Sequence, residues 1–283
     1  MFKKFTLNIK GRLFVADRPQ IMGIINVTPD SFYSGSRTLL EADIRSRVER
    51  MLEEGVDIVD IGAYSSRPGA ADVTPSEEMA RLETGMKIIR SLNAEIPVSV
   101  DTFRAEVACE AVCNMGADIV NDISGGDLDN AMWETVAELN TPYILMHMRG
   151  TPSDMQNFTD YADVTADVIA DLSRKLRQLR LMGVADVIVD PGFGFSKTLE
   201  QNFEMLRNLE VFTAALDAPL LAGMSRKSMI YKLLGTTPAE ALNGTTVLNT
   251  MALERGTSIL RVHDVKAAVE ALKLYMEMCG KCN

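Results

Sequence analysis

A repeated pattern of glycine, apolar run and polar residue constrains this chain more than any other feature. Four segments share it, namely EEGVDIVDIG, NMGADIVNDISGG, LMGVADVIVDPG and ERGTSILRVHD, which begin at positions 53, 114, 181 and 254. Each glycine suits the left-handed conformation that ends a helix. The Val and Ile run that follows is typical of a strand buried on both faces, as in a parallel sheet. The pattern therefore predicts alternating helices and parallel strands, with a polar residue at each strand end.

Extending the pattern along the chain predicts eight strands. They are expected at Gln20–Asn26, Val56–Gly62, Pro97–Asp101, Asp118–Asp122, Pro142–His147, Asp186–Asp190, Pro219–Gly223 and Ser258–Arg261. Two intervening helices should open with capping boxes, one from Thr74 to Glu77 and one from Thr237 to Glu240. The last helix should run from Val265 to Met278.

Eight strands alternating with helices fit either a closed barrel or a doubly wound sheet. A doubly wound dinucleotide fold needs a G-x-G-x-x-G motif after an early strand, whereas Pro191–Phe195 comes late and lacks that spacing. Only a closed barrel brings all eight strand ends together. We therefore predict one α/β domain over residues 1–283, a (β/α)8 TIM barrel. Residues 1–18, with Lys10-Gly11 between two alternating segments, should form a β-hairpin that covers its lower end.

Composition narrows the range of partners. The 283 residues are 47% hydrophobic and 24% charged, with a net charge of −10. Nucleic acid is not an expected partner, because phosphate backbones attract basic surfaces. No apolar run follows the N-terminal lysines, and no run is long enough to span a bilayer. We therefore expect no signal peptide, no membrane association and a cytoplasmic location.

The four cysteines predict no metal or redox site. Cys109 and Cys113 have helical spacing and are expected to be buried or partly buried thiols. Cys279 and Cys282 form a C-x-x-C pair outside the strand-to-helix setting of redox motifs. Their spacing does not indicate a zinc site, so we interpret them as free thiols of a frayed tail.

Polar residues follow the predicted strands one after another. In chain order they are Asn26, Asp60, Asp101, Asn121 with Asp122, His147, Asp190, Ser225 with Arg226 and Lys227, and Arg261 with His263. An Asp after a strand often only forms a turn or caps a helix. For Asp60 and Asp122 we give this structural role the same weight as a functional one. The set as a whole indicates function, because barrels hold their active sites at these ends.

The polar residues at the strand ends and in the loops beside them form two chemical groups. Hydrogen-bond acceptors and an amide, which suit a flat heterocycle with several N–H groups, come from Asp101, Asn121 and Asp190. Cations, which suit phosphate, come from Arg67, Lys227, Arg261 and His263. Asn26 is a candidate oxygen ligand for Mg²⁺. Two long polar loops, Val27–Leu40 and Ala63–Thr74, are expected to act as lids, whereas Arg149–Asp160 has no assigned role.

Seven motifs resemble dihydropteroate synthase, in that family's order and over nearly the whole chain. They are GIINVTPDSF (23–32), DIGAYSSRPGA (60–70), SVDTFRAEVA (99–108), IVNDISGG (119–126), DPGFGFSKT (190–198), GMSRKS (223–228) and RVHDV (261–265). The resemblance implies a homodimeric barrel that joins 7,8-dihydropterin-6-ylmethyl diphosphate to 4-aminobenzoate in folate synthesis. Sulfonamides, which mimic aminobenzoate, would compete for its site.

The resemblance also implies a role for each matching residue. The pterin would be held by Asp101, Asn121, Met146, Asp190, Gly223, Lys227 and Arg261. The diphosphate would be held by Asn26, Ser66, Arg67, Arg261 and His263, with Mg²⁺ on Asn26. The aminobenzoate pocket would be shaped by Phe32, Pro68, Phe195, Lys227 and Ser228. Asp101, Lys227 and Arg261 would act in catalysis, and Asp60, Asp122 and His147 would support the others.

This chemistry needs no protein nucleophile. Diphosphate would leave once Mg²⁺, Arg and His neutralise its charge, and the arylamine would attack a pterin methylene cation stabilised by the Asp carboxylates. Lid loops would exclude water from that cation. The chain has two histidines, which does not favour a Ser-His-Asp or multi-histidine site.

Two alternatives compete with this interpretation. A pterin-binding methyltransferase that works with a corrinoid protein would keep the Asp and Asn contacts but would not need the Arg and Lys set. A non-catalytic pterin binder is the second. The residue that favours a non-catalytic binder is Tyr64. The family's second loop more often reads Gly-Glu-Ser-Thr-Arg where this chain has Ala63 to Arg67, so Tyr64 replaces the Glu.

Overall fold

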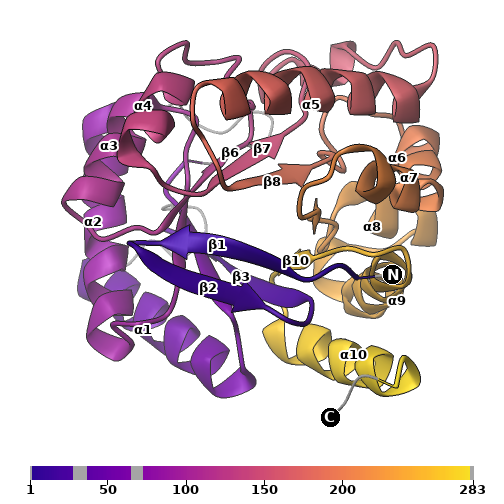
Figure 1. Ribbon diagram of the computed structural model, residues 1–283. Coiled ribbons are helices and arrows are strands. Elements are labelled where there is room, and N and C mark those ends of the chain that lie inside the picture. The colour runs from indigo at the N-terminus through magenta and orange to yellow at the C-terminus, as the bar shows by residue number, and fades with distance from the viewer. Residues whose placement is uncertain (1, 28–36, 65–72, 281–283) are drawn as a thin grey trace.

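Eight parallel strands form the centre of the molecule (Figure 1). The computed structural model describes residues 2–27, 37–64 and 73–280, and of residues 37–40 the backbone alone. The strands pair in the order β8-β7-β6-β5-β4-β3-β10-β9, and a parallel bridge between Val189 and Leu220 joins the two ends of that order. The predicted (β/α)8 barrel is confirmed. Its strands are β3 (Gln20–Asn26), β4 (Ile58–Gly62), β5 (Val98–Asp101), β6 (Ile119–Asp122), β7 (Tyr143–Met146), β8 (Val187–Asp190), β9 (Leu221–Ala222) and β10 (Ile259–Val262).

Helices surround the strands (Figure 1). They are α1 (Arg37–Glu54), α2 (Pro75–Leu92), α3 (Ala105–Cys113), α4 (Met132–Leu139), α5 (Val164–Leu181), α6 (Leu199–Arg207), α7 (Leu209–Ala215), α8 (Ser228–Leu234), α9 (Leu242–Glu254) and α10 (Val265–Met278). The Thr74 capping box opens α2 as predicted, with Glu77 N donating to Thr74 Oγ1 at 3.3 Å.

The second capping box differs from the prediction. Thr237 and Glu240 do cap each other, but they open a 3-10 helix (Pro238–Glu240), and α9 begins only at Leu242. The guanidinium of Arg226 accounts for this, because it donates to the carbonyls of Pro238 and Ala239, both at 2.7 Å. Carbonyls engaged in this way are drawn away from α-helical bonding.

The N-terminal hairpin closes one end of the barrel. Strands β1 (Phe5–Ile9) and β2 (Arg12–Ala16) meet at Lys10 and Gly11, whose φ angles of 50° and 77° match a two-residue turn with both centres left-handed. Leu7 is 1% exposed and packs among apolar residues near the N-terminal ends of seven strands: Met22, Ile58, Ile119, Ile144, Ile188, Leu221 and Ile259. This apolar plug leaves the C-terminal strand ends as the open side.

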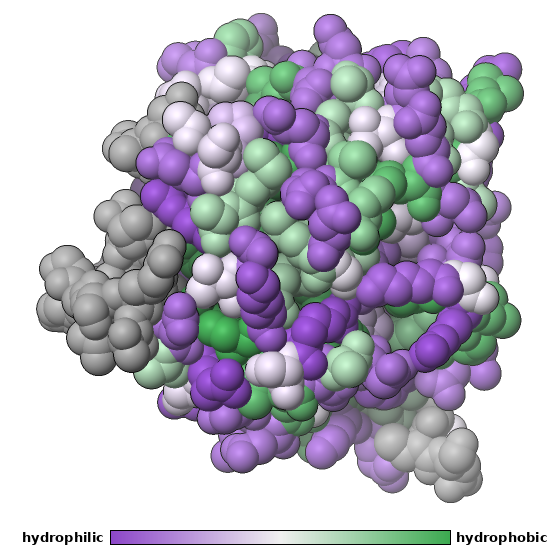
Figure 2. Space-filling model, turned by 90° about the vertical axis from the view of Figure 1, so that its left-hand side faces the viewer, coloured by the Kyte–Doolittle hydropathy of each residue, from purple (hydrophilic) through white to green (hydrophobic). Residues whose placement is uncertain are grey.

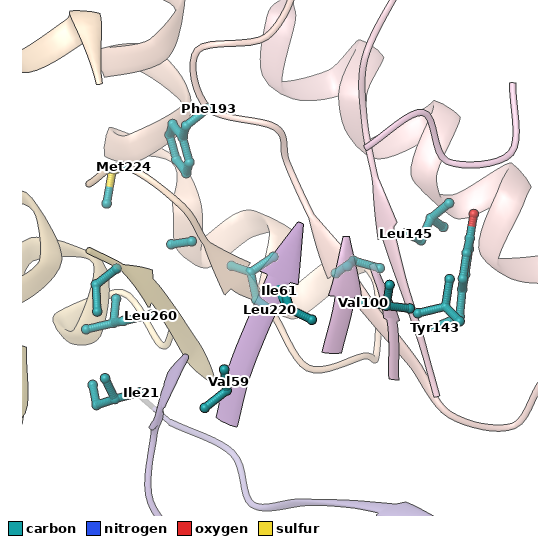
Figure 3. Close-up of a cluster of buried hydrophobic side chains, with 14 of the residues drawn as sticks. Ile21, Val59, Ile61, Val100, Tyr143, Leu145, Phe193, Leu220, Met224 and Leu260 are labelled. Carbon is teal, nitrogen blue, oxygen red and sulfur yellow. The ribbon is translucent and has the colours of Figure 1, made fainter. Parts of the chain in front are cut away.

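Side chains alternate between the lumen and the surrounding helices. Figure 3 shows outward-facing residues such as Val59, Ile61, Val100 and Leu145, which belong to the large buried cluster between strands and helices. The helices bury one side in this cluster, as with Leu82, Met86 and Ile89 of α2. Figure 2 shows that the outer face on the left of Figure 1 is mostly hydrophilic, with small hydrophobic groups between polar side chains.

The cysteine prediction was wrong in one respect. Cys109 and Cys113 lie on α3, as their spacing indicated, but both are exposed. The buried side of α3 carries Val107, Ala108 and Ala111 instead. Cys279 is partly buried, and Cys282 lies outside the described residues. In the described part of the chain, no helix has the length and apolar character needed to cross a membrane.

Candidate active site

The alternation of side chains along each strand builds the site. An inward residue, apolar on every strand except β5, where it is Ser99, is followed two positions later by a residue at the open side of the lumen. These second residues are Asp60, Asp101, Asn121, Met146, Asp190, Gly223 and Arg261, each from a different strand or its C-terminal end. Residues that lie far apart in the chain therefore meet around the axis of the barrel, as the sequence predicted.

Arg261 connects two carboxylates across the lumen. Its Nε donates to Asp60 Oδ2 at 2.7 Å, and its Nη2 lies 2.6 Å from Asp60 Oδ2 and 2.6 Å from Asp101 Oδ2. The amide of Asn121 donates more weakly to both Asp60 oxygens, at 3.3 and 3.4 Å. Asp60 is fully buried, so it is the anchor that orients Arg261 and Asn121.

Burial and neighbouring opposite charges have opposing effects on the pKa values of Asp101 and Arg261. Burial raises the pKa of Asp101 to about 7, with Asp60 adding to the rise and Arg261 opposing it. Burial alone would lower the pKa of Arg261, but Asp60 and Asp101 outweigh it, so its pKa is raised and the guanidinium stays charged. The site therefore holds a fixed cation and a carboxyl group that titrates near neutrality.

Asp190 and Lys227 form the second half of the lumen. Asp190 Oδ1 accepts a hydrogen bond from Gly192 N at 2.7 Å, and burial raises its pKa while the Lys227 charge opposes that rise. Burial lowers the pKa of Lys227 to about 8, against the charge of Asp190. Lys227 Nζ donates to Phe193 O and lies 4.4 Å from the centre of the Phe195 ring. An amine, a carboxylate and an aromatic face thus lie together.

Gly223 leaves space beside these groups. A Cβ added there would lie 3.9 Å from Asp190 Oδ2 and 3.9 Å from Arg261 Cβ. A larger side chain at this position would extend into the space between the two polar groups.

His263 differs from the sequence expectation of a cation. Its Nδ1 lies 3.0 Å from Ser225 Oγ, and burial, with the charges of Arg261 and Arg47, lowers its pKa to about 4. The imidazole is therefore neutral at pH 7 in the free protein. An anion bound beside it would raise that pKa again.

Arg226, which follows β9, points away from the lumen. Its Nε and Nη2 contact the Asp264 carboxylate at 2.8 and 2.9 Å, and its φ is 54°. Its role is to join the segment before α8 to the start of α10.

Only some of the residues predicted to bind diphosphate and aminobenzoate lie in the described part of the chain. Asn26 is the last residue of β3 and is partly exposed, and Ser228 is the first residue of α8. Phe32, Ser66, Arg67 and Pro68 lie outside the described residues. No group of three or more His, Cys, Asp or Glu side chains that could hold a metal occurs in the described chain. A single amide ligand fits a Mg²⁺ that takes its other ligands from substrate and water.

Asp122 and His147, for which the sequence predicted supporting roles, have hydrogen-bond partners outside the lumen. Asp122 accepts hydrogen bonds from the Ser124 backbone at 2.8 Å and from Tyr143 Oη at 2.7 Å. His147 Nδ1 lies 3.0 Å from Lys197 Nζ. Each follows an inward residue directly, so both belong to the outward-facing set.

An apolar group beside the lumen was predicted only in part, since Met146 and Phe195 were named from the sequence but their neighbours were not. Met146 packs with Ile123, Met148 and Met155, and Phe103, Leu128 and Phe195 pack against them. The sequence could have indicated these neighbours, because residues two positions apart along a strand face the same side. Phe103 lies two positions after Asp101, and Met148 lies two positions after Met146. Met155 brings the 149–160 loop, which had no assigned role, to the rim of the site. Tyr64 stacks edge-on against Phe103, with ring centres 5.0 Å apart.

Known proteins resemble the chain over nearly its whole length. A family model described as "Pterin binding enzyme" matches residues 22–263. A dihydropteroate synthase from Synechocystis is 42% identical over 262 residues, which are 91% of this chain and 89% of that protein. A folate synthesis bifunctional protein from Arabidopsis thaliana is 40% identical over 92% of this chain, but the chain spans only 57% of that relative's length.

A solved structure shows the same fold. Xanthomonas albilineans dihydropteroate synthase, determined with 4-aminobenzoic acid, superposes with a TM-score of 0.90 and 36% sequence identity. The similarity covers 98% of this chain and 99% of the other.

Proposed function

The chain belongs to the dihydropteroate synthase family of pterin binding enzymes, and from this premise we propose that it joins 7,8-dihydropterin-6-ylmethyl diphosphate to 4-aminobenzoate. The products would be dihydropteroate and diphosphate, as a step of folate synthesis. The reaction would break the C–O bond to the diphosphate and form a C–N bond to the arylamine, which loses a proton. The enzyme would be a transferase of the pterinylmethyl group.

The observation that carries this proposal is the pairing of acceptors and cations inside one closed lumen. Asp101 is paired with Arg261 at 2.6 Å, Asp190 interacts electrostatically with Lys227, and Asn121 bonds Asp60, which Arg261 also contacts. A pterin presents N–H donors and a carbonyl around a flat ring, so it can bond to the acidic groups and the cations together. The apolar group around Met146 and Phe195 would contact its ring.

The residues of this chain would promote the reaction by charge and position. The fixed cation of Arg261 would draw electron density onto the departing diphosphate, and His263 would donate a hydrogen bond or take up a proton once the anion is bound. The carboxylates of Asp101 and Asp190 would stabilise the positive charge that develops on the pterin. Lys227 and the Phe195 ring would orient the arylamine toward the methylene carbon.

A Mg²⁺ ion would be held by Asn26 together with diphosphate oxygens and water. When bound, it would neutralise charge on the leaving group. The fit rests on the chemistry of the residues at the rim, which offer one amide oxygen from Asn26 and no cluster of carboxylates among the described positions. Ser66 and Arg67, from the second loop, complete the proposed diphosphate set.

Phe32, Pro68, Phe195, Lys227 and Ser228 would form the aminobenzoate pocket. The first two come from the loops that we propose to act as lids, so that pocket would be completed only when those loops close over bound pterin. Sulfonamides carry an arylamine like that of aminobenzoate and would compete there. Enclosure would keep water from the developing cation.

One assay tests the proposed function. The protein is incubated with the pterin diphosphate, Mg²⁺ and radiolabelled 4-aminobenzoate, and labelled dihydropteroate is the expected product. A methyltransferase that uses a corrinoid protein, or a pterin binder without activity, would give none. Asp101→Asn should lower turnover strongly and weaken pterin binding, and unchanged kinetics would contradict the role of Asp101.

We also propose a cytoplasmic homodimer. Exposed apolar side chains gather on the last three helices, at Leu233, Leu234, Leu242, Val247, Met251, Leu274 and Met278. A groove of about 710 Å³ runs between α9 and α10 and includes Leu274 and Met278. Burying this surface against a second copy would be favourable. Sedimentation velocity should show a dimer that Leu274→Glu dissociates, and a monomeric parent protein would contradict this.

A further inference from the structure

A buried lysine that the proposed reaction does not use lies beneath the turn after β8. Lys197 is 3% exposed. Its Nζ donates to Phe195 O at 2.9 Å and to Gly192 O at 3.1 Å, and lies 3.0 Å from His147 Nδ1. Burying an ammonium group costs free energy unless its three donors are satisfied, and here each has a partner. Lys197 therefore fastens the 192–195 turn to the end of β7.

The turn depends on such an attachment. Gly192 and Gly194 have φ angles of 73° and 81°, and Ser196 has a φ of 46°, which is unfavourable for a residue with a side chain. A Cβ at Gly192 would lie only 2.0 Å from His147 O. The turn is thus pressed against β7 in a conformation that needs contacts from outside the turn to maintain it.

The same turn determines where two proposed substrate contacts lie. The carbonyl of Phe193 accepts a hydrogen bond from Lys227 Nζ, and the Phe195 ring lies 4.4 Å from that nitrogen. A Cβ on Gly194 would lie 3.0 Å from Lys227 Cδ, so the backbone of the turn lies directly against the lysine stem. Any shift of the turn would therefore move Phe195 and Lys227 together.

We infer that Lys197 is a positioning residue for the arylamine side of the site. It holds the 192–195 turn from beneath, and through that turn it fixes the Phe195 ring and the Lys227 amine without contacting substrate itself. This inference rests on the proposed function, because it assigns the two groups to aminobenzoate. His147 shares the role by supplying the third acceptor.

The test replaces the buried lysine with an apolar residue of similar length. In Lys197→Met, the KM for 4-aminobenzoate should rise about tenfold, as expected for a misplaced contact worth one or two hydrogen bonds, and kcat should fall. The affinity for the pterin diphosphate, measured by calorimetry without aminobenzoate, should change by about threefold or less. A merely structural role would lower stability without this selectivity.

The matched control is another deeply buried lysine. Lys175 of α5 is 0% exposed and is ion-paired with Asp127 at 2.6 Å and with Asp171 at 3.5 Å. Lys175→Met should cost stability but leave the aminobenzoate KM unchanged. His147→Asn retains an acceptor and should keep the KM near that of the parent protein, whereas His147→Leu should raise it.

Two results would overturn the inference. One is an aminobenzoate KM that does not change in Lys197→Met, and the other is an equal change in Lys175→Met. If the parent protein forms no dihydropteroate, the proposed function fails instead. In that case a crystal structure of Lys197→Met, or of Lys197→Gln if the first variant does not fold, tests the positioning role of Lys197 independently of activity. We expect Phe195 and Lys227 to shift, and unchanged positions would refute the role of Lys197.

Discussion

Asp60 offers the sharpest test of the charge balance in the lumen. The perturbation is Asp60→Asn, which removes one negative charge and keeps the size of the side chain. Asp60 Oδ2 and Asp101 Oδ2 each lie 2.6 Å from Arg261 Nη2, so they are at most about 5 Å apart. At an effective dielectric constant of about 20, that separation corresponds to about 3 kcal/mol of repulsion, or about two pKa units.

The sign of the effect follows from the cause of the Asp101 shift. Burial raises the pKa of Asp101 to about 7, and the Asp60 charge raises it further against the effect of Arg261. Removing that charge should lower the Asp101 pKa, by roughly one unit because Asn keeps a dipole toward Arg261. If turnover needs ionised Asp101, the acid limb of kcat/KM against pH should move by the same amount to lower pH.

The control for this experiment is another buried aspartate. Asp122→Asn makes the same substitution at a fully buried carboxylate, but one that bonds Ser124 and Tyr143 outside the lumen. It should lower stability and leave the acid limb nearly in place. An acid limb that stays put or moves upward in Asp60→Asn, or that moves equally in Asp122→Asn, would refute the reasoning.

Three further predictions concern the lumen and the turn after β8. Arg261→Ala should abolish calorimetric binding of diphosphate and lower the free energy of unfolding in urea by about 3 kcal/mol, because it leaves the buried Asp60 and the partly buried Asp101 without their cation. Retained binding would contradict its role. Gly192→Ala, which would place a Cβ 2.0 Å from His147 O, should lower Tm well beyond Gly183→Ala, where φ is also positive (91°) but nothing lies within 4 Å; equal losses would show that backbone strain alone matters. Burial lowers the pKa of Lys197 to about 7, so above that pH the unfolded chain binds more protons than the folded one. The free energy of unfolding should therefore rise between about pH 7 and pH 10, and it should rise less steeply in Lys197→Met.

Local patterns in the sequence were sufficient for the barrel and for most of its site. The repeated pattern, found in four segments and extended along the chain, predicted the starts of all eight strands to within two residues. The polar residues at their ends could be predicted to meet, because parallel strands in a barrel all point to one rim. Asp101, Asn121, Asp190 and Arg261 required nothing more than this argument.

Tertiary structure decided which of those residues pair and which are charged. Asp60 and Asp122 look alike in the sequence, each following a buried strand, yet one faces Arg261 in the lumen and the other bonds Tyr143 outside it. A one-residue difference in phase separates them, and only the packed strands show which phase faces inward.

The neutral state of His263 and the role of Lys197 depended in the same way on burial and on partners distant in the chain. The ring of polar residues at the strand ends was therefore determined by the sequence. Its division into contacts, anchors and supports came from the three-dimensional packing, because desolvation and pairing arise only when the strands are assembled.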